Sequence, residues 1–294
     1  GTYRFFIRAY GSGGSTRVAI DDVVAPGTYA ADPSNQCLPL INNPDADGDG
    51  VSDIEDAYPN DNQKAFNSRL LAADFGTLMF EDNWPAKGDY DFNDVVVDYN
   101  LNRITNASNQ VVEVVATFVL RATGAGYKNG FGFSFDGLAA NRVVSVTGTN
   151  LTSSSIYNIA ANGVEAGQSD ATFVVFGNAY GVLTHPGNSL GINTQLSAAF
   201  VSPVTITLNI RFTDAQGNFV AGPVGLQDIG LANFNPFIVV DQQRGVEVHL
   251  PGKRPTNLAN GALFNTKDDR SNLSAGQTYR TATNLPWALQ TPVS

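Results

Sequence analysis

The stretch VTITLNIRF, residues 204–212, gives the clearest indication of how this chain folds. Its apolar side chains fall at every second position and are Val204, Ile206, Leu208, Ile210 and Phe212. The residues between them are polar, namely Thr205, Thr207, Asn209 and Arg211. Successive side chains of a β-strand point to opposite faces, so this alternation predicts a strand with one buried face and one solvated face.

Other segments with strand-like composition surround this one. They are residues 70–80, 95–101, 110–121, 130–135 and 172–176. Gly, Asn and Pro separate them, and no amphipathic helix of convincing length stands between them. We therefore expect an all-β protein, built as an antiparallel two-sheet sandwich or jelly roll. Residues 251–294 hold few strand-like runs, and we expect them to pack onto the surface through Leu258, Leu263, Phe264, Leu285 and Trp287.

The chain divides into three predicted parts. Residues 1–10 and 17–24 predict a β-hairpin within residues 1–25. Two strands cannot bury an apolar face alone, so the hairpin is either a remnant of a preceding β-domain, packed locally, or a strand donor that completes the sheet of another subunit. Residues 26–68 are predicted to form a linker that carries an acidic loop, and residues 69–294 are predicted to form the sandwich.

Charge is concentrated in two places. The 294 residues have a net charge of −10, of which residues 45–61 contribute −7 and residues 81–98 contribute −5, so the rest of the chain is about +2. This pattern indicates two metal-binding regions and does not favour nucleic acid as a partner. Cys37 is the only cysteine, so no intrachain disulfide can form. The sequence shows no signal peptide or membrane span, and because Gly1 is not a natural start we expect a mature, processed or excised piece.

The first acidic loop, DADGDGVSDIED, comprises residues 45–56. It presents oxygen ligands at the first, third, fifth, seventh, ninth and twelfth positions: Asp45, Asp47, Asp49, the backbone carbonyl of Val51, Asp53 and Asp56. That is the order of an EF-hand calcium loop, with Gly50 at the sixth position for the sharp turn. The loop resembles the calcium repeats of thrombospondin type 3 and dockerin-like modules, although Asp56 stands where Glu is usual. The alternative is a solvated acidic linker.

The second acidic segment, residues 81–94, lies in FEDNWPAKGDYDFNDVVVDYN (80–100). Its candidate calcium ligands are Glu81, Asp89, Asp91, Asn93 and Asp94. Hard oxygen ligands on a connection between two strands suit calcium. The alternative is an Asp- and Asn-rich turn whose side chains bond their own backbone.

A family resemblance extends through the C-terminal three quarters of the chain. FEDNWPAKGDYDFNDVVVDYN resembles the signature of the LruC domain of bacterial surface and secreted proteins. The resemblance continues through RGVEVHLPGKRPTN (244–257), LFNTKDD (263–269) and NLPWAL (284–289), and so covers about residues 70–294. It implies a β-fold, a location outside the cell or on the bacterial surface, and a domain that runs past Ser294.

The residues that most enzymes need are scarce here. His185 and His249 have no partner at a zinc-binding spacing, and a Cys37–His dyad would place its nucleophile in a linker. There is no G-x-S-x-G elbow and no phosphate-binding loop, and the clustered carboxylates are already needed for metal. We therefore expect the protein not to be an enzyme.

Two functions remain as expectations. The first is a calcium-stabilised structural or assembly module of a bacterial surface protein, adhesin or filament, whose partners are copies of itself or neighbouring surface proteins. Millimolar calcium is an extracellular condition, which favours this location. The alternative is a calcium-dependent carbohydrate-binding module that takes glycans on exposed aromatic residues. Its candidate aromatics are Trp84, Tyr90, Tyr127 and Trp287.

Overall fold

Antiparallel strands dominate the computed structural model, which describes residues 44–291 except residues 73, 125, 152–154, 185, 186 and 188–190. The predicted hairpin of residues 1–25, Cys37 and His185 lie outside the described residues. The strands are β1 (Phe66–Arg69), β2 (Gly76–Phe80), β3 (Val95–Thr105), β4 (Val111–Ala122), β5 (Gly130–Ala139), β6 (Ser145–Thr147), β7 (Asp170–Phe176), β8 (Val204–Arg211), β9 (Phe234–Val239), β10 (Glu247–His249) and β11 (Ala288–Thr291). The helices are all short: α1 (Ala179–Val182) and the 3-10 turns η1 (Ala140–Arg142), η2 (Val240–Gln242), η3 (Gly261–Leu263) and η4 (Leu273–Ala275).

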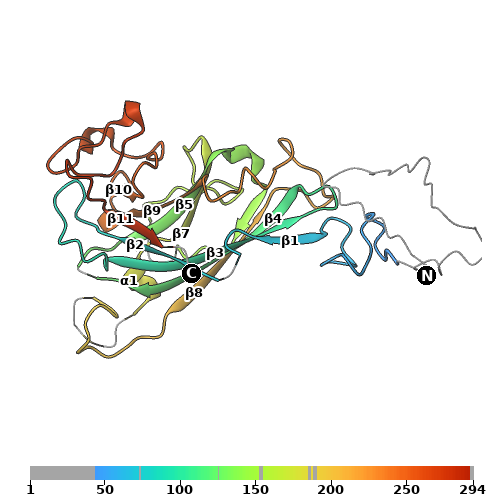
Figure 1. Ribbon diagram of the computed structural model, residues 1–294, viewed down its shortest axis with the longest axis horizontal. Helices are drawn as coiled ribbons and strands as arrows, with labels where there is room; N and C mark the ends of the chain where they lie inside the picture. Colours follow the sequence, from blue (N-terminus) through green and yellow to red (C-terminus); the bar gives the residue numbers. More distant parts are fainter. Residues whose placement is uncertain are drawn as a thin grey trace, which may run out of the picture.

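The strands form two sheets that face each other (Figure 1). The large sheet has seven strands in the order β11-β2-β3-β4-β8-β6, with β1 also paired to β3, and the small sheet has the order β10-β9-β5-β7. Every strand pair is antiparallel. The predicted all-β, two-sheet sandwich is therefore confirmed.

Aromatic rings fill the space between the two sheets. Phe118 of β4 lies edge-on to Phe131 of β5, with ring centroids 5.3 Å apart. Tyr99 of β3 stacks on Phe234 of β9 at 4.9 Å. Burying each such ring removes a large apolar area from water, and the ring geometry adds to that gain. The stretch 204–212 supplies part of the same core, because the alternate positions of β8 are buried as its pattern predicts.

The C-terminal segment covers the outer face of the small sheet (Figure 1). The ring of Tyr279 stacks on His249 of β10 at 5.1 Å, and His249 stacks in turn on Phe237 of β9 at 4.9 Å. The prediction that this segment packs onto the surface is correct for Phe264 and Trp287, which are buried. It is wrong for two of the named anchors, since Leu258 and Leu285 are exposed. Their apolar character gave no information about which side of the segment faces the sheet.

A buried network of charges ties this layer to the small sheet. Arg244 forms ion pairs with Glu165 and Glu247. His249 Nε2 lies 2.9 Å from a Glu247 carboxylate oxygen, and its Nδ1 lies 2.7 Å from Asn235 Oδ1. The Asn235 amide nitrogen donates to two other acceptors, which fixes its oxygen toward the ring. Both ring nitrogens of His249 therefore lie within hydrogen-bond distance of side-chain oxygens, and the ring links Glu247 to Asn235.

Glu247 shows the electrostatic effect of this network. Burial acts to raise the pKa of its carboxyl, but the hydrogen bond and charge of His249, together with the Arg244 guanidinium, lower the pKa to about 2. A buried carboxylate is costly unless it is paired, and here Arg244 forms an ion pair with it. The network reaches the C-terminal segment through Thr256, whose backbone N–H and hydroxyl donate to Glu247.

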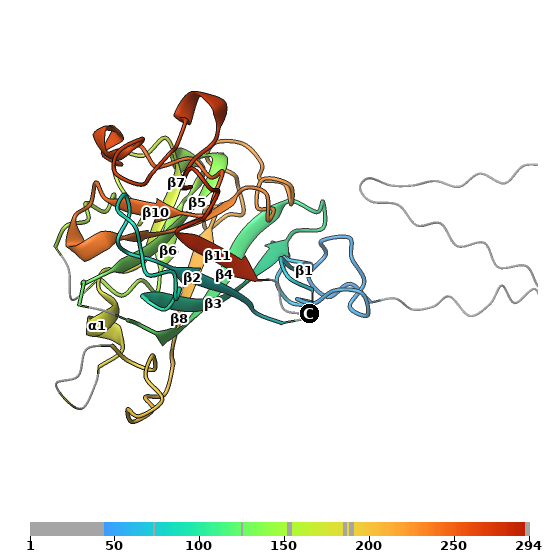
Figure 2. The ribbon, with the colours of Figure 1, turned by 60° about the vertical axis from the view of Figure 1, so that its left-hand side comes forward.

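The two acidic regions lie at opposite ends of the sandwich. Figures 1 and 2 both show the first acidic loop beyond β1 at one end, and the second acidic segment, which connects β2 to β3, toward the other end. They are consequently two separate candidate sites.

Candidate metal centres

The first acidic loop winds its backbone around its own carboxylates. Asp45 accepts hydrogen bonds from the backbone N–H groups of Gly48 (2.8 Å) and Gly50 (3.0 Å). Asp47 and Asp49 each accept one from the residue two positions later, at 3.2 and 2.7 Å. Gly50 has a φ of 96°, a left-handed conformation that glycine adopts readily. The structure thus contains the turn that the sequence pattern predicts at the sixth position.

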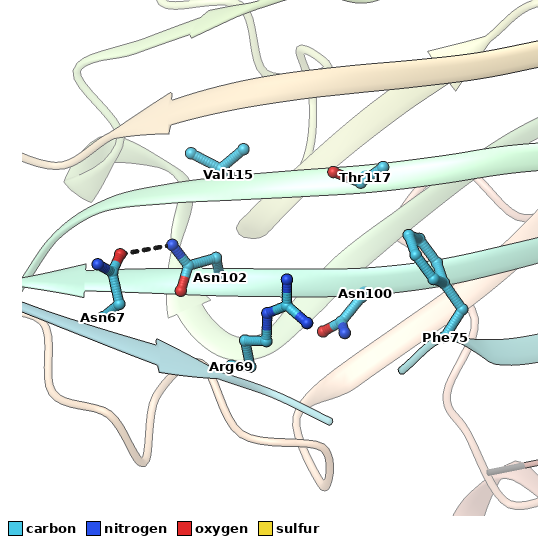
Figure 3. Close-up of a pocket in the computed structure, with 7 residues that line it drawn as sticks. All are labelled: Asn67, Arg69, Phe75, Asn100, Asn102, Val115 and Thr117. Carbon is cyan, nitrogen blue, oxygen red and sulfur yellow. Dashed lines mark hydrogen bonds between the residues drawn. The ribbon is translucent and has the colours of Figure 1, made fainter. Parts of the chain in front are cut away.

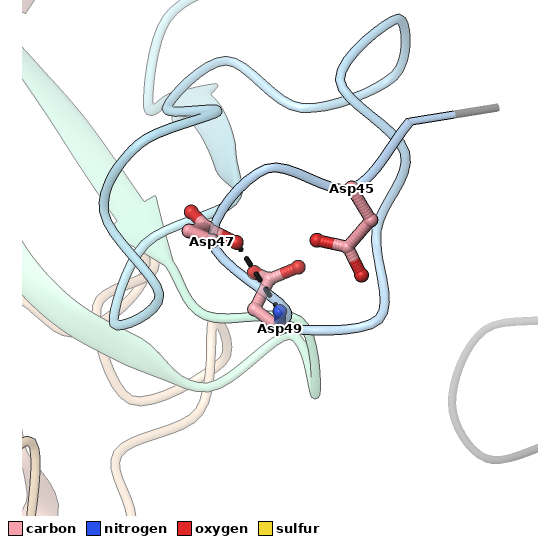
Figure 4. Close-up of side chains that lie close together, drawn as sticks. All are labelled: Asp45, Asp47 and Asp49. Atoms are coloured by element: carbon pink, nitrogen blue, oxygen red, sulfur yellow. Dashed lines mark hydrogen bonds between the residues drawn. The ribbon is translucent and has the colours of Figure 1, made fainter.

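The carboxylates of this loop converge. One oxygen from each of Asp45, Asp47 and Asp49 lies within 4.8 Å of the other two (Figure 4). Asp53 accepts a backbone N–H bond from near the start of the loop at 2.8 Å, which closes it. Asp56, at the twelfth position, is 8% exposed. Val51, whose carbonyl is the predicted seventh-position ligand, is half-buried in the same loop.

Three carboxylate oxygens of the loop are buried without a donor. They are Oδ2 of Asp47, of Asp49 and of Asp56, and none accepts a hydrogen bond from any part of the chain that the structure describes. Burying a charged oxygen without a hydrogen-bond donor costs about 2 kcal/mol or more of folding free energy. Oxygens of this kind, at the third, fifth and twelfth positions, are what a calcium ion takes as ligands.

The second acidic segment forms around the buried side chain of Glu81. Its carboxylate accepts hydrogen bonds from the backbone N–H groups of Tyr90 (3.0 Å) and Phe92 (2.5 Å), both of which have positive φ. One oxygen of Glu81 lies within 4.8 Å of oxygens from Asp89 and Asp91. Burial raises the pKa of Glu81, and the two N–H bonds oppose that rise while the charges of Asp89 and Asp91 add to it. A cation between the three carboxylates would relieve both the burial and the repulsion.

Asp94 lies in a different group from Glu81. Its Oδ2 accepts the backbone N–H of Asp82 at 2.8 Å, and Asp82 in turn accepts the amide of Asn129 at 2.8 Å. Burial, followed by the charge of Asp82, raises the pKa of Asp94 to about 8, and burial also raises the pKa of Asp82. Two buried carboxyls this close are neutralised by a proton or by a cation.

The sequence placed Asp82 in the acidic region but not among the candidate ligands, and it gave no indication of the Asn129 amide that donates to Asp82. Asn129 immediately precedes β5, and its Oδ1 accepts the backbone N–H of Asp241 at 3.2 Å. The pairing of β5 with β9 brings Asn129 close to Asp241, and no local motif connects either residue with Asp82. The side-chain amide of Asn93, a predicted ligand, donates to Asp91.

Two of the four aromatic residues of the carbohydrate alternative are buried. Trp84 and Trp287 are 3% and 0% exposed, so neither is available as a platform for a sugar. Trp84 packs on Phe264 and Tyr279 in the C-terminal layer instead. Tyr127 is exposed and Tyr90 half-buried. The expectation of exposed rings was wrong for both tryptophans. Burying a large aromatic ring is favourable, and the irregular sequence around each tryptophan does not show that the ring is buried.

Comparison with known proteins places the chain in a family. The sequence model of a family described as "Domain of unknown function (DUF4842)" matches residues 109–294. The chain belongs to the DUF4842 family. Both acidic regions of this DUF4842 protein lie before the matched residues, which begin just ahead of β4.

One solved structure is similar to the DUF4842 protein. It is the crystal structure of a "Putative lipoprotein" from Bacteroides ovatus at 2.08 Å resolution, with 20% sequence identity and a TM-score of 0.49. The similarity covers 78% of the DUF4842 chain and 66% of the lipoprotein chain. A search of the curated proteins found no match.

Proposed function

We propose that this DUF4842 protein is a calcium-stabilised structural module that works outside the bacterial cell. The observation that carries the proposal is the set of buried carboxylate oxygens of Asp47, Asp49 and Asp56 that receive no hydrogen bond within the described chain. A calcium ion bound among them, with Asp45, Asp53 and the carbonyl of Val51 as further ligands, would compensate their burial. The order of these ligands along the loop is that of an EF-hand loop.

The residues after the loop connect it to the sandwich. The backbone N–H of Ala65 donates to the Thr105 carbonyl at the end of β3, at 2.7 Å. Lys64 pairs with Glu113 of β4 at 2.9 Å. A cation in the loop would therefore set the direction in which the chain enters the sandwich. In this proposal calcium fixes a joint, since the described residues that follow the loop form no long helix that could swing open as in a calcium sensor.

The second acidic segment has a parallel role in the proposal. A cation held by Glu81, Asp89 and Asp91, with Asn93 and Asp94 close by in sequence, would stiffen the connection between β2 and β3. The backbone bonds from Tyr90 and Phe92 to Glu81 already shape this connection. The alternative of a self-bonded turn accounts for those bonds but leaves the repulsion between the three carboxylates without compensation.

The location and partners are also proposed. Loops of this type bind calcium at about 0.1–1 mM in extracellular modules, a concentration reached outside cells. The resemblance to the LruC domain favours the bacterial surface. None of the described helices is long and apolar enough to cross a membrane. We propose no enzymatic activity, and as partners other copies of the chain or neighbouring surface proteins, with residues 1–25 as the candidate donated strand.

Calcium titration tests the proposal. Melting is measured in 10 mM calcium and in excess chelator, for the wild type, for Asp49→Asn and for Glu55→Gln. With a Kd of about 0.1–1 mM, 10 mM calcium stabilises the native state by about 1.4–2.7 kcal/mol, which raises Tm by roughly 3–10 °C. Asp49→Asn should lose most of that rise.

The matched control comes from the same loop. Glu55 is exposed and occupies the eleventh position, which supplies no ligand, so Glu55→Gln removes one charge and should keep the rise in Tm. Equal melting curves for the wild type in calcium and in chelator would refute a stabilising site. Equal losses in the two variants would show that calcium acts only through the general negative charge of the loop.

A further inference from the structure

A polar groove crosses the outer face of the large sheet, and none of the candidate metal ligands lines it. It has a volume of about 560 Å³ and is lined by Asn67, Arg69, Phe75, Asn100, Asn102, Val115 and Thr117 (Figure 3). The groove exists because β1 and β2 both pair with β3, and the chain between them leaves the sheet beside Asn100. Val115 and Thr117 of β4 form its floor opposite β3. The volume is within the range of sites for small ligands.

Two amide oxygens in the groove lack donors. Asn100 is 7% exposed, and its amide nitrogen donates to the carbonyls of Leu71 and Asp74 at 3.4 and 2.6 Å, which fixes its orientation. Asn102 donates to Asn67 Oδ1 at 2.7 Å. The Oδ1 atoms of Asn100 and Asn102 accept no hydrogen bond from the described residues. A buried amide oxygen is normally paired, so two in one groove indicate that a ligand supplies the donors.

Donors and a ring stand beside these acceptors. The Arg69 guanidinium lies next to Asn100 and Asn102 in Figure 3, and no described residue pairs with its nitrogens. Arg69 is at the exposed end of β1, so its side chain has room to turn toward a ligand. The hydroxyl of Thr117 also lines the groove, and the half-buried ring of Phe75 closes one end.

We propose that this groove binds an oligosaccharide. Sugar hydroxyls both donate and accept, so one sugar ring can donate to the Asn100 and Asn102 oxygens and accept from Arg69 and Thr117. The apolar C–H face of a sugar ring can pack on Phe75, as aromatic side chains provide apolar contact beside polar groups. The site uses none of the four aromatics that the sequence suggested, and none of the metal-ligand candidates. The inference is therefore independent of the proposed calcium function.

Other ligand classes match the groove less well. A polyanion would meet a single cation and two unpaired oxygens, which repel negative charge. An extended peptide adds to the edge of a sheet, where backbone groups are unpaired, whereas this groove lies on a face whose strands are already paired. An apolar ligand would leave the amides of Asn100 and Asn102 unsatisfied.

The test uses an array of defined plant, host and bacterial oligosaccharides, followed by titration of the strongest binder into the full chain in calcium and in chelator. Thr117→Phe fills the groove from a half-exposed position, and it should weaken binding at least about tenfold. Arg69→Ala removes one donor group from an exposed side chain, and it should weaken binding roughly three- to tenfold. Thr205→Phe is the control, because Thr205 lies on the same outer face in β8, exposed and outside the groove.

The outcomes are distinct. Binding that Thr117→Phe and Arg69→Ala weaken, and Thr205→Phe leaves unchanged, supports the proposal. A wild-type chain that binds no oligosaccharide on the array overturns it, and so does binding that Thr117→Phe leaves unchanged. Melting temperatures equal to that of the wild type show that a loss is not caused by misfolding. Because the groove contains no metal-ligand candidate, binding should persist in chelator at temperatures where the chain stays folded, whether or not calcium binds the first acidic loop.

Discussion

Replacing Glu247 by Gln should cost the protein a large part of its stability at neutral pH. The carboxylate accepts from Arg244 and His249, and the side chains of Glu247 and His249 are fully buried. Removing one member of a buried charge network leaves its partners unpaired, which costs about 3–5 kcal/mol. Here Glu247→Gln would remove one of the two carboxylates that pair with Arg244, and Glu165 would be the remaining carboxylate of the network.

The same substitution should remove a defined part of the acid sensitivity. The lowering of the Glu247 pKa from 4.5 to about 2 corresponds to about 3 kcal/mol of stability. A carboxyl with a lowered pKa contributes this stability fully above the unfolded pKa and loses it as the pH falls through the folded value. The difference between wild type and Glu247→Gln should therefore be constant above about pH 5 and be about 2 kcal/mol smaller at pH 3.

Urea unfolding followed by tryptophan fluorescence measures this difference, because both tryptophans are buried. The control is Asp170→Asn, which breaks an ion pair with the exposed Arg254 and should cost less than about 1 kcal/mol at any pH. A cost below about 1 kcal/mol for Glu247→Gln at pH 7 would refute the account of the network. A cost that stays the same from pH 7 to pH 3 would refute the assignment of the lowered pKa to Glu247.

Two further substitutions test the packing of the layers. Trp287→Ala should cost about 3–5 kcal/mol, because this ring of the C-terminal segment is fully buried, whereas Leu285→Ala at a nearby exposed site should cost about 0.5 kcal/mol or less. Gly132→Ala should cost about 1–3 kcal/mol, since its new Cβ would lie 2.6 Å from the backbone oxygen of Phe173 on the paired strand β7. Gly261→Ala, with nothing within 4 Å of the new Cβ, is the control. Thermal melts check all four, and equal losses within either pair would contradict the packing described.

The periodicity of the sequence was sufficient to predict that the fold consists of two layers of β-strands. Strands such as β4 and β8 have one buried face, so their residues repeat with period two, and this repeat can be read without knowing the partner strand. The strands of the small sheet were harder to predict from the sequence. Strand β9 is buried on both faces, because the C-terminal segment covers one side of it. Residues 251–291 have no period of their own, and so which of their apolar side chains face the sheet could not be predicted.

The first acidic loop is a feature that the sequence determined by itself. Its ligand candidates lie within twelve consecutive residues, so their spacing along the chain sets their spacing in space, and the convergence of Asp45, Asp47 and Asp49 follows. The arrangement of the second acidic segment could be predicted from the sequence only in part. Asp94 joins Asp82 because β2 pairs with β3 so that Phe80 lies opposite Val95. Asn129 joins them from the other sheet, which no spacing along the chain indicates.

Only the tertiary structure revealed the outer groove and the buried charge network. Arg69, Asn100 and Thr117 come from three different strands, and Glu165 and Glu247 are far apart in the chain. Polar residues on the outward face of a strand look alike in sequence whether they face water or line a groove. The distinction depends on which strand lies alongside and where the chain leaves the sheet, and those long-range pairings are not encoded in any local spacing.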